Sequence, residues 1–282
     1  GGALMVKIRN ILISVVLVVV VLAIIGYLLT PKETTPEEAL PKETPPTASP
    51  YELRIEKIYY YNEAGKDTYV ILDLSAKYNA DGKWSVWRSG FMLLTDKGAV
   101  LGTAAMPFYL KDCFKNELLF SVDAVKYGYT RFQVAFSIPL NEKPVKLIYV
   151  EHGIKIELPI TEDTVSYVSY YDYAKVKLVT KPPLSEFDVL AFLSSWLVGC
   201  QIAGSEFSVS IDVKASSFMM GADKIAVTKI ETRAATLVDV APKPPIILRR
   251  GEEARVVIVL QAPANFSYSG PLEITLTIEP AK

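Results

Sequence analysis

The chain has 282 residues, half of them apolar and 22% charged, and its formal net charge is -1. A balance so close to neutrality argues against nucleic-acid binding, which needs a basic surface. The single histidine excludes a two-histidine metal site, and neither a GxSxG turn nor a glycine-rich phosphate loop occurs. The sequence therefore predicts no enzyme activity and no cofactor.

Residues 11–29 are an apolar run without a charged side chain. About 20 such residues cross the hydrocarbon core of a bilayer as a helix. A cleaved secretory signal is the alternative, but its apolar stretch is shorter and a small-x-small cleavage site follows it, which "GYLLTPKE" does not offer. We expect a single uncleaved transmembrane helix that acts as a signal anchor.

The charges beside this run predict its orientation. Lys7 and Arg9 lie just before it, whereas the far side mixes lysine with glutamate. The positive-inside rule places residues 1–10 in the cytoplasm and the bulk of the chain outside the cell membrane, in an extracellular or pseudo-periplasmic location.

Residues 30–50 predict an extended stalk. The stretch is rich in threonine and glutamate, and its prolines exclude a helix: Pro31, Pro36, Pro41, Pro45, Pro46 and Pro50. The whole chain also has only six asparagines and three glutamines. Such a scarcity of thermolabile amides is typical of a hot habitat, and we expect a thermophile.

Residues 51–160 have the period of two that strands show. "YVILDLSAKY" places Val70, Leu72, Leu74 and Ala76 on one face, and "RFQVAFSI" does the same with Phe132, Val134, Phe136 and Ile138. "EHG" at 151–153 predicts a hairpin turn. Short alternating strands with tight turns predict an antiparallel β-sandwich.

The order of these segments carries a resemblance. "DTYVILDLSAKYNADGKW", then "FMLLTDKGAVLG", then "YTRFQVAFSIP" and "VKLIYV" resemble telokin-like sandwiches, in particular a family of that fold attached to lipoprotein and membrane anchors of bacteria and archaea. The resemblance covers roughly residues 51–158. It implies a sandwich on the cell surface and no catalytic activity, and with the expected hot habitat it implies an archaeal source.

Residues 161–282 predict a second β-sandwich with one helix. Within "SEFDVLAFLSSWLVGC", Ser185 and Asp188 have capping-box spacing, apolar residues follow with helical periodicity, and Gly199 can end the helix. We expect that helix at about 185–198. Clean alternation returns in "FSVSIDVKA", with Phe207, Val209, Ile211 and Val213 inward.

The end of the chain carries a second resemblance. "PPIILRRGEEARVVIVLQAP" and "YSGPLEITLTI" are similar to the terminal strands of immunoglobulin-like modules, including the cell-adhesion-related domain of prokaryotic surface proteins. This resemblance covers about residues 204–282. The predicted fold is thus mainly β, with two antiparallel β-sandwiches, one telokin-like and one immunoglobulin-like, on one N-terminal transmembrane helix.

Few residues are candidates for a site. Cys113 and Cys200 lie in different predicted sandwiches, and two separately buried thiols are favoured over a disulfide between them. Asn265 in "NFS" is a glycosylation sequon. An aromatic interface is expected from the predicted helix and a tyrosine cluster, at Phe192, Trp196, Tyr167, Tyr170 and Tyr171.

The function predicted from these features is protein–protein assembly in the cell envelope. The partners would be the membrane, through a single span, and other envelope or membrane-complex proteins, with no nucleic acid and no small-molecule ligand. The alternative is a solute- or glycan-binding accessory receptor with its ligand near Trp84, Trp87 or the tyrosine cluster. A second alternative is a subunit of an extracellular filament.

Overall fold

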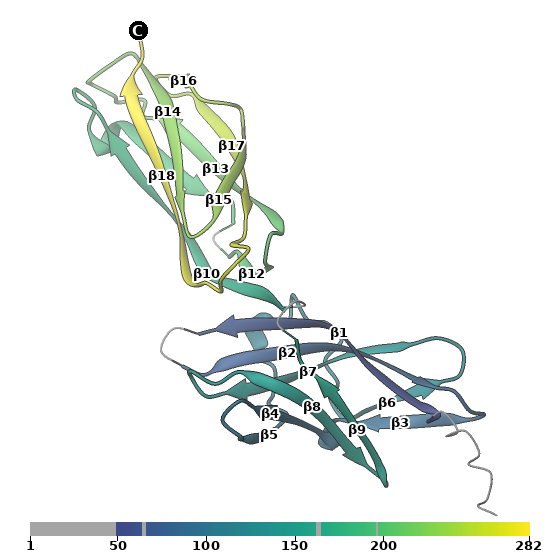
Figure 1. Cartoon of the computed structure of the whole chain (residues 1–282). Helices are drawn as coiled ribbons and strands as arrows, with labels where there is room; N and C mark the ends of the chain where they lie inside the picture. Colours follow the sequence, from purple (N-terminus) through teal and green to yellow (C-terminus); the bar gives the residue numbers. More distant parts are fainter. Residues whose placement is uncertain (1–48, 64–65, 162–164, 196) are drawn as a thin grey trace, which may run out of the picture. The chain divides into compact units, whose positions relative to one another are not determined.

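A computed structural model describes residues 49–63, 66–161, 165–195 and 197–282 (Figure 1). Ser49–Lys282 form one compact unit. The expected cytoplasmic segment 1–10, transmembrane helix 11–29 and almost all of the stalk lie outside the described residues. Among the residues that the structure does describe, no helix is both long enough and apolar enough to cross a membrane.

The described chain is mainly β, as its period of two predicts. Up to Pro159 it contains short 3-10 turns η1 (Arg88–Gly90) and η2 (Phe108–Leu110) and these strands: β1 (Tyr51–Asn62), β2 (Thr68–Tyr78), β3 (Lys83–Trp87), β4 (Phe91–Thr95), β5 (Val100–Gly102), β6 (Ser121–Val125), β7 (Thr130–Ile138), β8 (Pro144–Glu151) and β9 (Ile154–Pro159).

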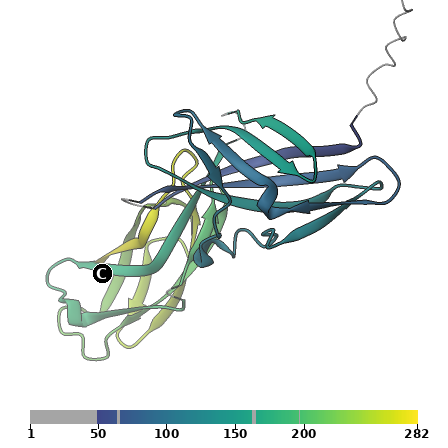
Figure 2. The ribbon, with the colours of Figure 1, turned by 90° about the horizontal axis from the view of Figure 1, so that it is seen from below.

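The remainder of the described chain continues as strands, with the 3-10 turn η4 (Glu186–Asp188) among them. The strands are β10 (Val165–Thr180), β11 (Val189–Leu193), β12 (Gly199–Ile202), β13 (Glu206–Ala215), β14 (Lys224–Arg233), β15 (Thr236–Ala241), β16 (Ile246–Arg249), β17 (Glu253–Gln261) and β18 (Ser269–Pro280). The colours of Figure 2 follow the chain through both groups, from purple and blue to green and yellow.

A first apolar core lies among the strands up to β9. Strands β1, β2 and β7 are neighbours in one sheet, β5, β4, β8 and β9 form another, and β3 pairs with β6. The predicted inward residues of β2 and β7 are all buried in this core: Val70, Leu72, Leu74, Ala76, Phe132, Val134, Phe136 and Ile138. Sheets that enclose a common core in this way are consistent with a β-sandwich.

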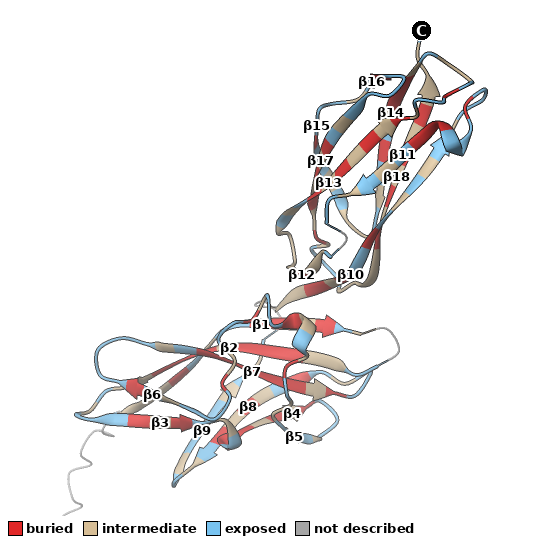
Figure 3. Ribbon diagram, turned by 180° about the vertical axis from the view of Figure 1, so that it is seen from behind, coloured by how far each residue is buried: buried red, intermediate tan, exposed pale blue. Residues whose placement is uncertain are grey.

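A second core lies among the later strands. One side of it is a sheet of order β11-β13-β17-β15, and the other side is formed by strands β16, β14, β18 and β10. These four strands belong to the same eight-stranded sheet as β1, β2 and β7. Alternate residues of β18 point into it and are fully buried: Leu272, Ile274, Leu276 and Ile278. Figure 3 shows this alternation as red bands along the strands. The predicted inward residues of β13 follow the same rule, although Phe207 is only partly buried.

The prediction of purely antiparallel sheets is wrong at β10. This strand pairs in parallel with β1, where Ile58–Tyr60 lie opposite Val165–Tyr167, and in parallel with β18 over most of its length. At 16 residues, β10 is long enough to pair with β1 at its start and with β18 farther on, which joins these strands in one sheet. Neither β1 nor β18 is connected to β10 by a hairpin, so no tight turn forces an antiparallel pairing between them.

The predicted helix at about 185–198 is also wrong. The segment forms the single turn η4 and then strand β11, and β12 begins at Gly199. In β11, Val189 is buried and Ala191 and Leu193 are partly buried, whereas Leu190 and Phe192 are exposed, which is a period of two. A short apolar run fits both periods, and pairing with β13 satisfies the backbone of β11 here.

Candidate functional site

A disulfide joins Cys113 to Cys200, with their Cα atoms 5.9 Å apart. Cys113 follows η2, and its backbone N–H donates to Leu110 O at 3.0 Å; Cys200 lies in β12, opposite Tyr170 of β10. The expectation of two separate thiols is therefore wrong. The residues are 87 positions apart, so no local spacing predicts that they meet.

The disulfide lies in a third apolar cluster. This cluster combines residues of β1, β2 and β7 with the segment around η2 and with β10 and β12; its buried members are Tyr59, Tyr61, Ile71, Met106, Leu110, Phe114, Ala135, Val168 and Cys200. Residues from both halves of the described chain thus share one core. A covalent bond and apolar packing act at the same place.

The predicted tyrosine interface is divided among three environments. Tyr171 is fully buried in the second core and donates its hydroxyl to Ala234 O at 2.7 Å, so its place as an interface residue is wrong. Burial raises the pKa of Tyr171. Tyr170 packs against the third cluster, and Tyr167 packs edge-on against Tyr60. Strand alternation sends neighbouring side chains to opposite faces, which separates them.

The other predicted site residues do not gather with the tyrosines. Phe192 is 57% exposed on β11, opposite Asp212 of β13. Trp196 lies outside the described residues. Asn265 is exposed between β17 and β18, and the Ser267 hydroxyl of its sequon donates to Tyr60 O at 2.8 Å. The interface role of Phe192 and the glycosylation of Asn265 stay predictions.

An aromatic pocket of about 300 Å³ opens where β3 ends and η1 begins. It is lined by Trp87, Arg88, Ser89, Thr103, Leu119 and Phe120. Trp87 is 41% exposed, Leu119 57% and Phe120 79%. Large apolar side chains are therefore accessible beside a guanidinium and two hydroxyls, which is the mixture that small-ligand sites use.

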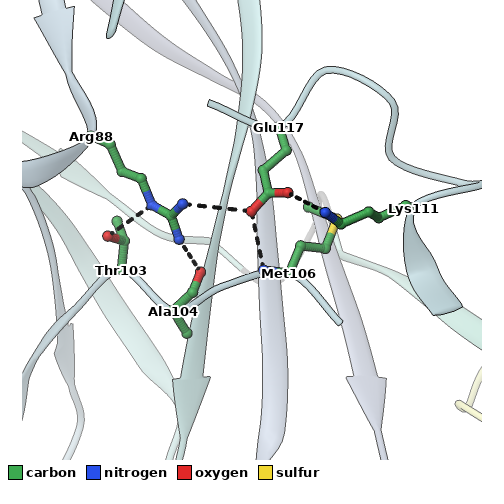
Figure 4. Close-up of polar contacts among 6 residues, drawn as sticks. All are labelled: Arg88, Thr103, Ala104, Met106, Lys111 and Glu117. Carbon is green, nitrogen blue, oxygen red and sulfur yellow. Dashed lines mark hydrogen bonds and ion pairs between the residues drawn. The ribbon is translucent and has the colours of Figure 1, made fainter. Parts of the chain in front are cut away.

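Glu117 does not line the pocket, but it contacts Arg88, which does (Figure 4). The Glu117 side chain is only 10% exposed. Its carboxylate accepts the backbone N–H of Met106 at 3.1 Å and lies 3.6 Å from Arg88 Nη1 and 3.5 Å from Lys111 Nζ. A carboxylate so poorly hydrated needs opposite charge around it. The two cations supply that charge, and Glu117 in turn holds Arg88 in place.

Arg88 is fixed from three sides. Its Nη2 donates to Ala104 O at 2.7 Å and its Nε to Thr103 Oγ1 at 3.3 Å, besides the contact with Glu117 (Figure 4). The guanidinium has five N–H donors in a planar fork. These partners prevent the side chain from rotating away. They do not use all five N–H donors, so some remain for a ligand.

Backbone hydrogen bonds hold the segments that line the pocket. The N–H of Arg88 donates to Phe120 O, that of Ala104 to Ala135 O and that of Leu118 to Gln133 O, each at 2.8 Å. The exposed apolar side chains are therefore attached to a fixed backbone. Such pre-organisation lowers the entropy cost of binding.

The sequence identified this pocket only in part. Trp84 and Trp87 are both expected near a ligand. Of the two, only Trp87 lines the pocket, because Trp84 is buried in the first core. Arg88, Glu117 and Phe120 were not anticipated. The "NELLF" run at 116–120 was the available signal, because its adjacent leucines and phenylalanine fit no alternating strand. Nothing in the spacing connects Arg88 with Glu117.

Comparisons with protein-family models, with curated proteins and with solved structures find no match to this chain. Within the described ranges, no three histidine, cysteine or acidic side chains lie together as a metal site would require. The features of the described chain that bear on function are the disulfide, the pocket and the exposed apolar residues.

Proposed function

We propose that the chain is a membrane-anchored interaction protein of the cell envelope, with residues 49–282 outside the cytoplasm. In this proposal residues 11–29 are the anchor and residues 30–50 the stalk. The β-rich part presents a telokin-like sandwich and an immunoglobulin-like sandwich to other envelope proteins.

The observation that carries the proposal is the disulfide between Cys113 and Cys200. Disulfides persist in oxidising compartments and are rare in the cytosol of mesophiles. Intracellular proteins of hyperthermophiles are an exception, and the amide-poor composition points to a hot habitat. The compartment therefore has to be measured directly, together with the state of the cysteines.

The proposed mode of action is binding rather than catalysis. The exposed side chains that are large and apolar include Trp87, Phe120 and Phe192, which lie on strands or on segments held by backbone hydrogen bonds. Rigid exposed aromatic groups suit recognition because they bury much area at little entropy cost. The edge strands of the sheets add backbone groups that can recruit a further strand.

Protease treatment of intact spheroplasts tests the orientation. External protease should cut the stalk and release a β-rich fragment while a cytoplasmic marker protein stays intact. On a non-reducing gel, thiol alkylation before and after reduction should show that Cys113 and Cys200 react only after reduction. A chain that is cut only after detergent lysis would refute the orientation, and thiols that react without reductant would remove the observation on which the proposal rests.

A further inference from the structure

We propose that the pocket formed by Trp87, Arg88, Ser89, Thr103, Leu119 and Phe120 binds a saccharide unit of a glycan. This assigns a ligand class to the binding module of the proposed function. Its chemistry does not depend on which side of the membrane the module occupies, so the two proposals fail separately.

The shape and lining favour a ligand with one apolar face and a polar rim. Trp87, Leu119 and Phe120 offer accessible apolar surface. The pocket volume of about 300 Å³ is at the lower end of the range for ligand pockets. Aromatic rings bind C–H-bearing faces by dispersion and by the electrostatics of their π systems. The C–H face of a pyranose ring has this character, and its hydroxyls supply the polar rim.

The hydrogen-bonding groups at the pocket also match hydroxyls. The Thr103 oxygen accepts from Arg88 Nε, which leaves the Thr103 hydroxyl proton for a ligand acceptor. The exposed Ser89 hydroxyl makes no hydrogen bond with any described residue, and Arg88 retains N–H donors. A sugar hydroxyl both donates and accepts, so it can pair with each of these groups.

An extended peptide is the competing ligand, and the backbone argues against it here. A peptide that adds to a strand needs free backbone N–H and C=O groups. At this pocket the N–H groups of Trp87 and Arg88 already donate, to Tyr149 Oη and Phe120 O, so a peptide strand cannot pair with them. The side chains of Arg88, Ser89 and Thr103 keep polar groups that discrete hydroxyls can use.

Charge is a further criterion. The charge of Arg88 is balanced by Glu117, and its guanidinium also donates to Thr103 Oγ1 and Ala104 O. Lys111 leaves one net positive charge on this group of three, but its side chain is 54% exposed and solvated. The site is therefore suited to neutral sugars and tolerates a uronic acid, whereas binding does not require an anion.

The test uses the full chain in a detergent without a sugar head group, because glycoside detergents would compete. The probes are hexasaccharides of glucose, mannose and N-acetylglucosamine and an oligogalacturonate, with binding followed by saturation-transfer NMR and by calorimetry. At least one probe should bind. Trp87→Ala should weaken that binding at least tenfold and Ser89→Ala several-fold, whereas Tyr127→Ala should leave it unchanged, since Tyr127 is 88% exposed and does not line the pocket.

Circular dichroism and the thermal midpoint of each variant show whether it has folded. Ser89→Ala is the safeguard, because it removes only an exposed hydroxyl. Absence of binding for all four probes would overturn the proposal. So would equal binding by the Trp87 and Tyr127 variants, or saturable binding of an apolar peptide at this pocket without any saccharide binding. None of these three results would alter the protease pattern that tests the orientation.

Discussion

The carboxylate of Asp188 accepts a hydrogen bond from the backbone N–H of Met220, 3.2 Å away, and so joins two loops. Its other oxygen accepts the backbone N–H of Ser185 at 2.7 Å and the Ser185 hydroxyl at 2.9 Å. Asp188 is buried, while the neighbouring Phe187 and Met220 are 80% and 94% exposed. The carboxylate therefore holds the backbone of two loops that present apolar side chains to solvent.

Asp188→Ala should lower the free energy of unfolding by about 2 kcal/mol, because it leaves the N–H groups of Ser185 and Met220 without their charged acceptor. Thermal and denaturant unfolding of the full chain would measure this. Glu186→Ala is the matched control, since Glu186 is exposed in the same turn. Equal effects of the two substitutions would show that the carboxylate does not stabilise the loops.

The effect of Asp188 should also depend on pH. The hydrogen bond from the backbone of Ser185 is the main cause that lowers the pKa of Asp188 below its ordinary value. Because the folded pKa is the lower one, the stabilisation is complete above the unfolded pKa of about 3.9 and is lost as the pH falls through the folded pKa. The difference in stability between the wild type and Asp188→Ala should therefore shrink below about pH 4. A difference that is constant from pH 6 to pH 2 would contradict this explanation.

Gly221 brings the same two loops into close contact. A Cβ at this position would lie 2.6 Å from Pro183 O, which is a backbone atom and cannot move alone. Gly221→Ala should therefore cost about 1–3 kcal/mol of stability. Gly102→Ala is the control, because nothing lies within 4 Å of the added Cβ. Denaturant midpoints of the two variants should differ clearly, and coincident midpoints would refute the steric argument.

Local rules predicted much of the fold because they depend on neighbours in sequence. The hairpin at 151–153 is an example. His152 and Gly153 have φ angles of +47° and +79°, as a tight turn between β8 and β9 needs, and those strands pair as predicted. The alternation of β7 likewise predicted four buried residues correctly.

The same local rules failed where a distant partner decides the structure. Ser185 and Asp188 do form the predicted capping contacts, but the chain leaves the turn as β11 because β13 offers a strand edge beside it. Which element follows a capping signal thus depends on tertiary context. The period of the apolar residues alone was ambiguous over so short a run.

The pocket and the disulfide could not be predicted for a related reason. Arg88 directly follows β3, which pairs with β6, and Glu117 lies opposite Gln133 of β7. Cys113 and Cys200 are brought together by packing in the third cluster. Contacts between residues so far apart in the chain produce no repeating pattern that a single sequence could show. Only Trp87 and the non-alternating apolar run that includes Leu119 and Phe120 could suggest pocket residues from the sequence.

Loss of the disulfide should destabilise the chain markedly. The crosslink spans 87 residues, and closing a loop of that length is expected to contribute about 2–5 kcal/mol. Cys113→Ser, Cys200→Ser and the double variant should have the same lowered thermal midpoint, and wild type treated with reductant should match them. A wild-type midpoint that does not respond to reductant would show that the bond contributes no stability.

The ion pairs of Glu157 should matter far less. Lys146 and Lys155 lie 2.7 and 2.8 Å from its carboxylate, and the hydrogen bond with Lys146 is the main cause that lowers the pKa of Glu157 to about 2. All three side chains are well solvated, so salt screens the interaction. Glu157→Gln should shift the thermal midpoint only slightly, and less at 1 M salt than at 0.05 M. A shift as large as that of the cysteine variants would contradict the surface assignment.

Phe192 tests whether the edge of a sheet serves assembly. It lies on β11, an end strand of the sheet β11-β13-β17-β15, with its side chain 57% exposed. An end strand with an exposed aromatic side chain can recruit a partner through backbone hydrogen bonds and an aromatic contact. Because little of Phe192 is buried in the chain itself, Phe192→Ala should cost no more than about 1 kcal/mol of stability.

Under the proposed function, the same substitution should reduce recovery of partner proteins after mild cross-linking in membranes and purification through a tagged full chain. Val238→Ala is the matched control, since Val238 is 47% exposed on β15, the opposite end strand of that sheet. A role of β11 in assembly requires that the Phe192 variant lose partners that the Val238 variant keeps while both retain the wild-type thermal midpoint. Equal recovery from the two variants would show that Phe192 is ordinary surface.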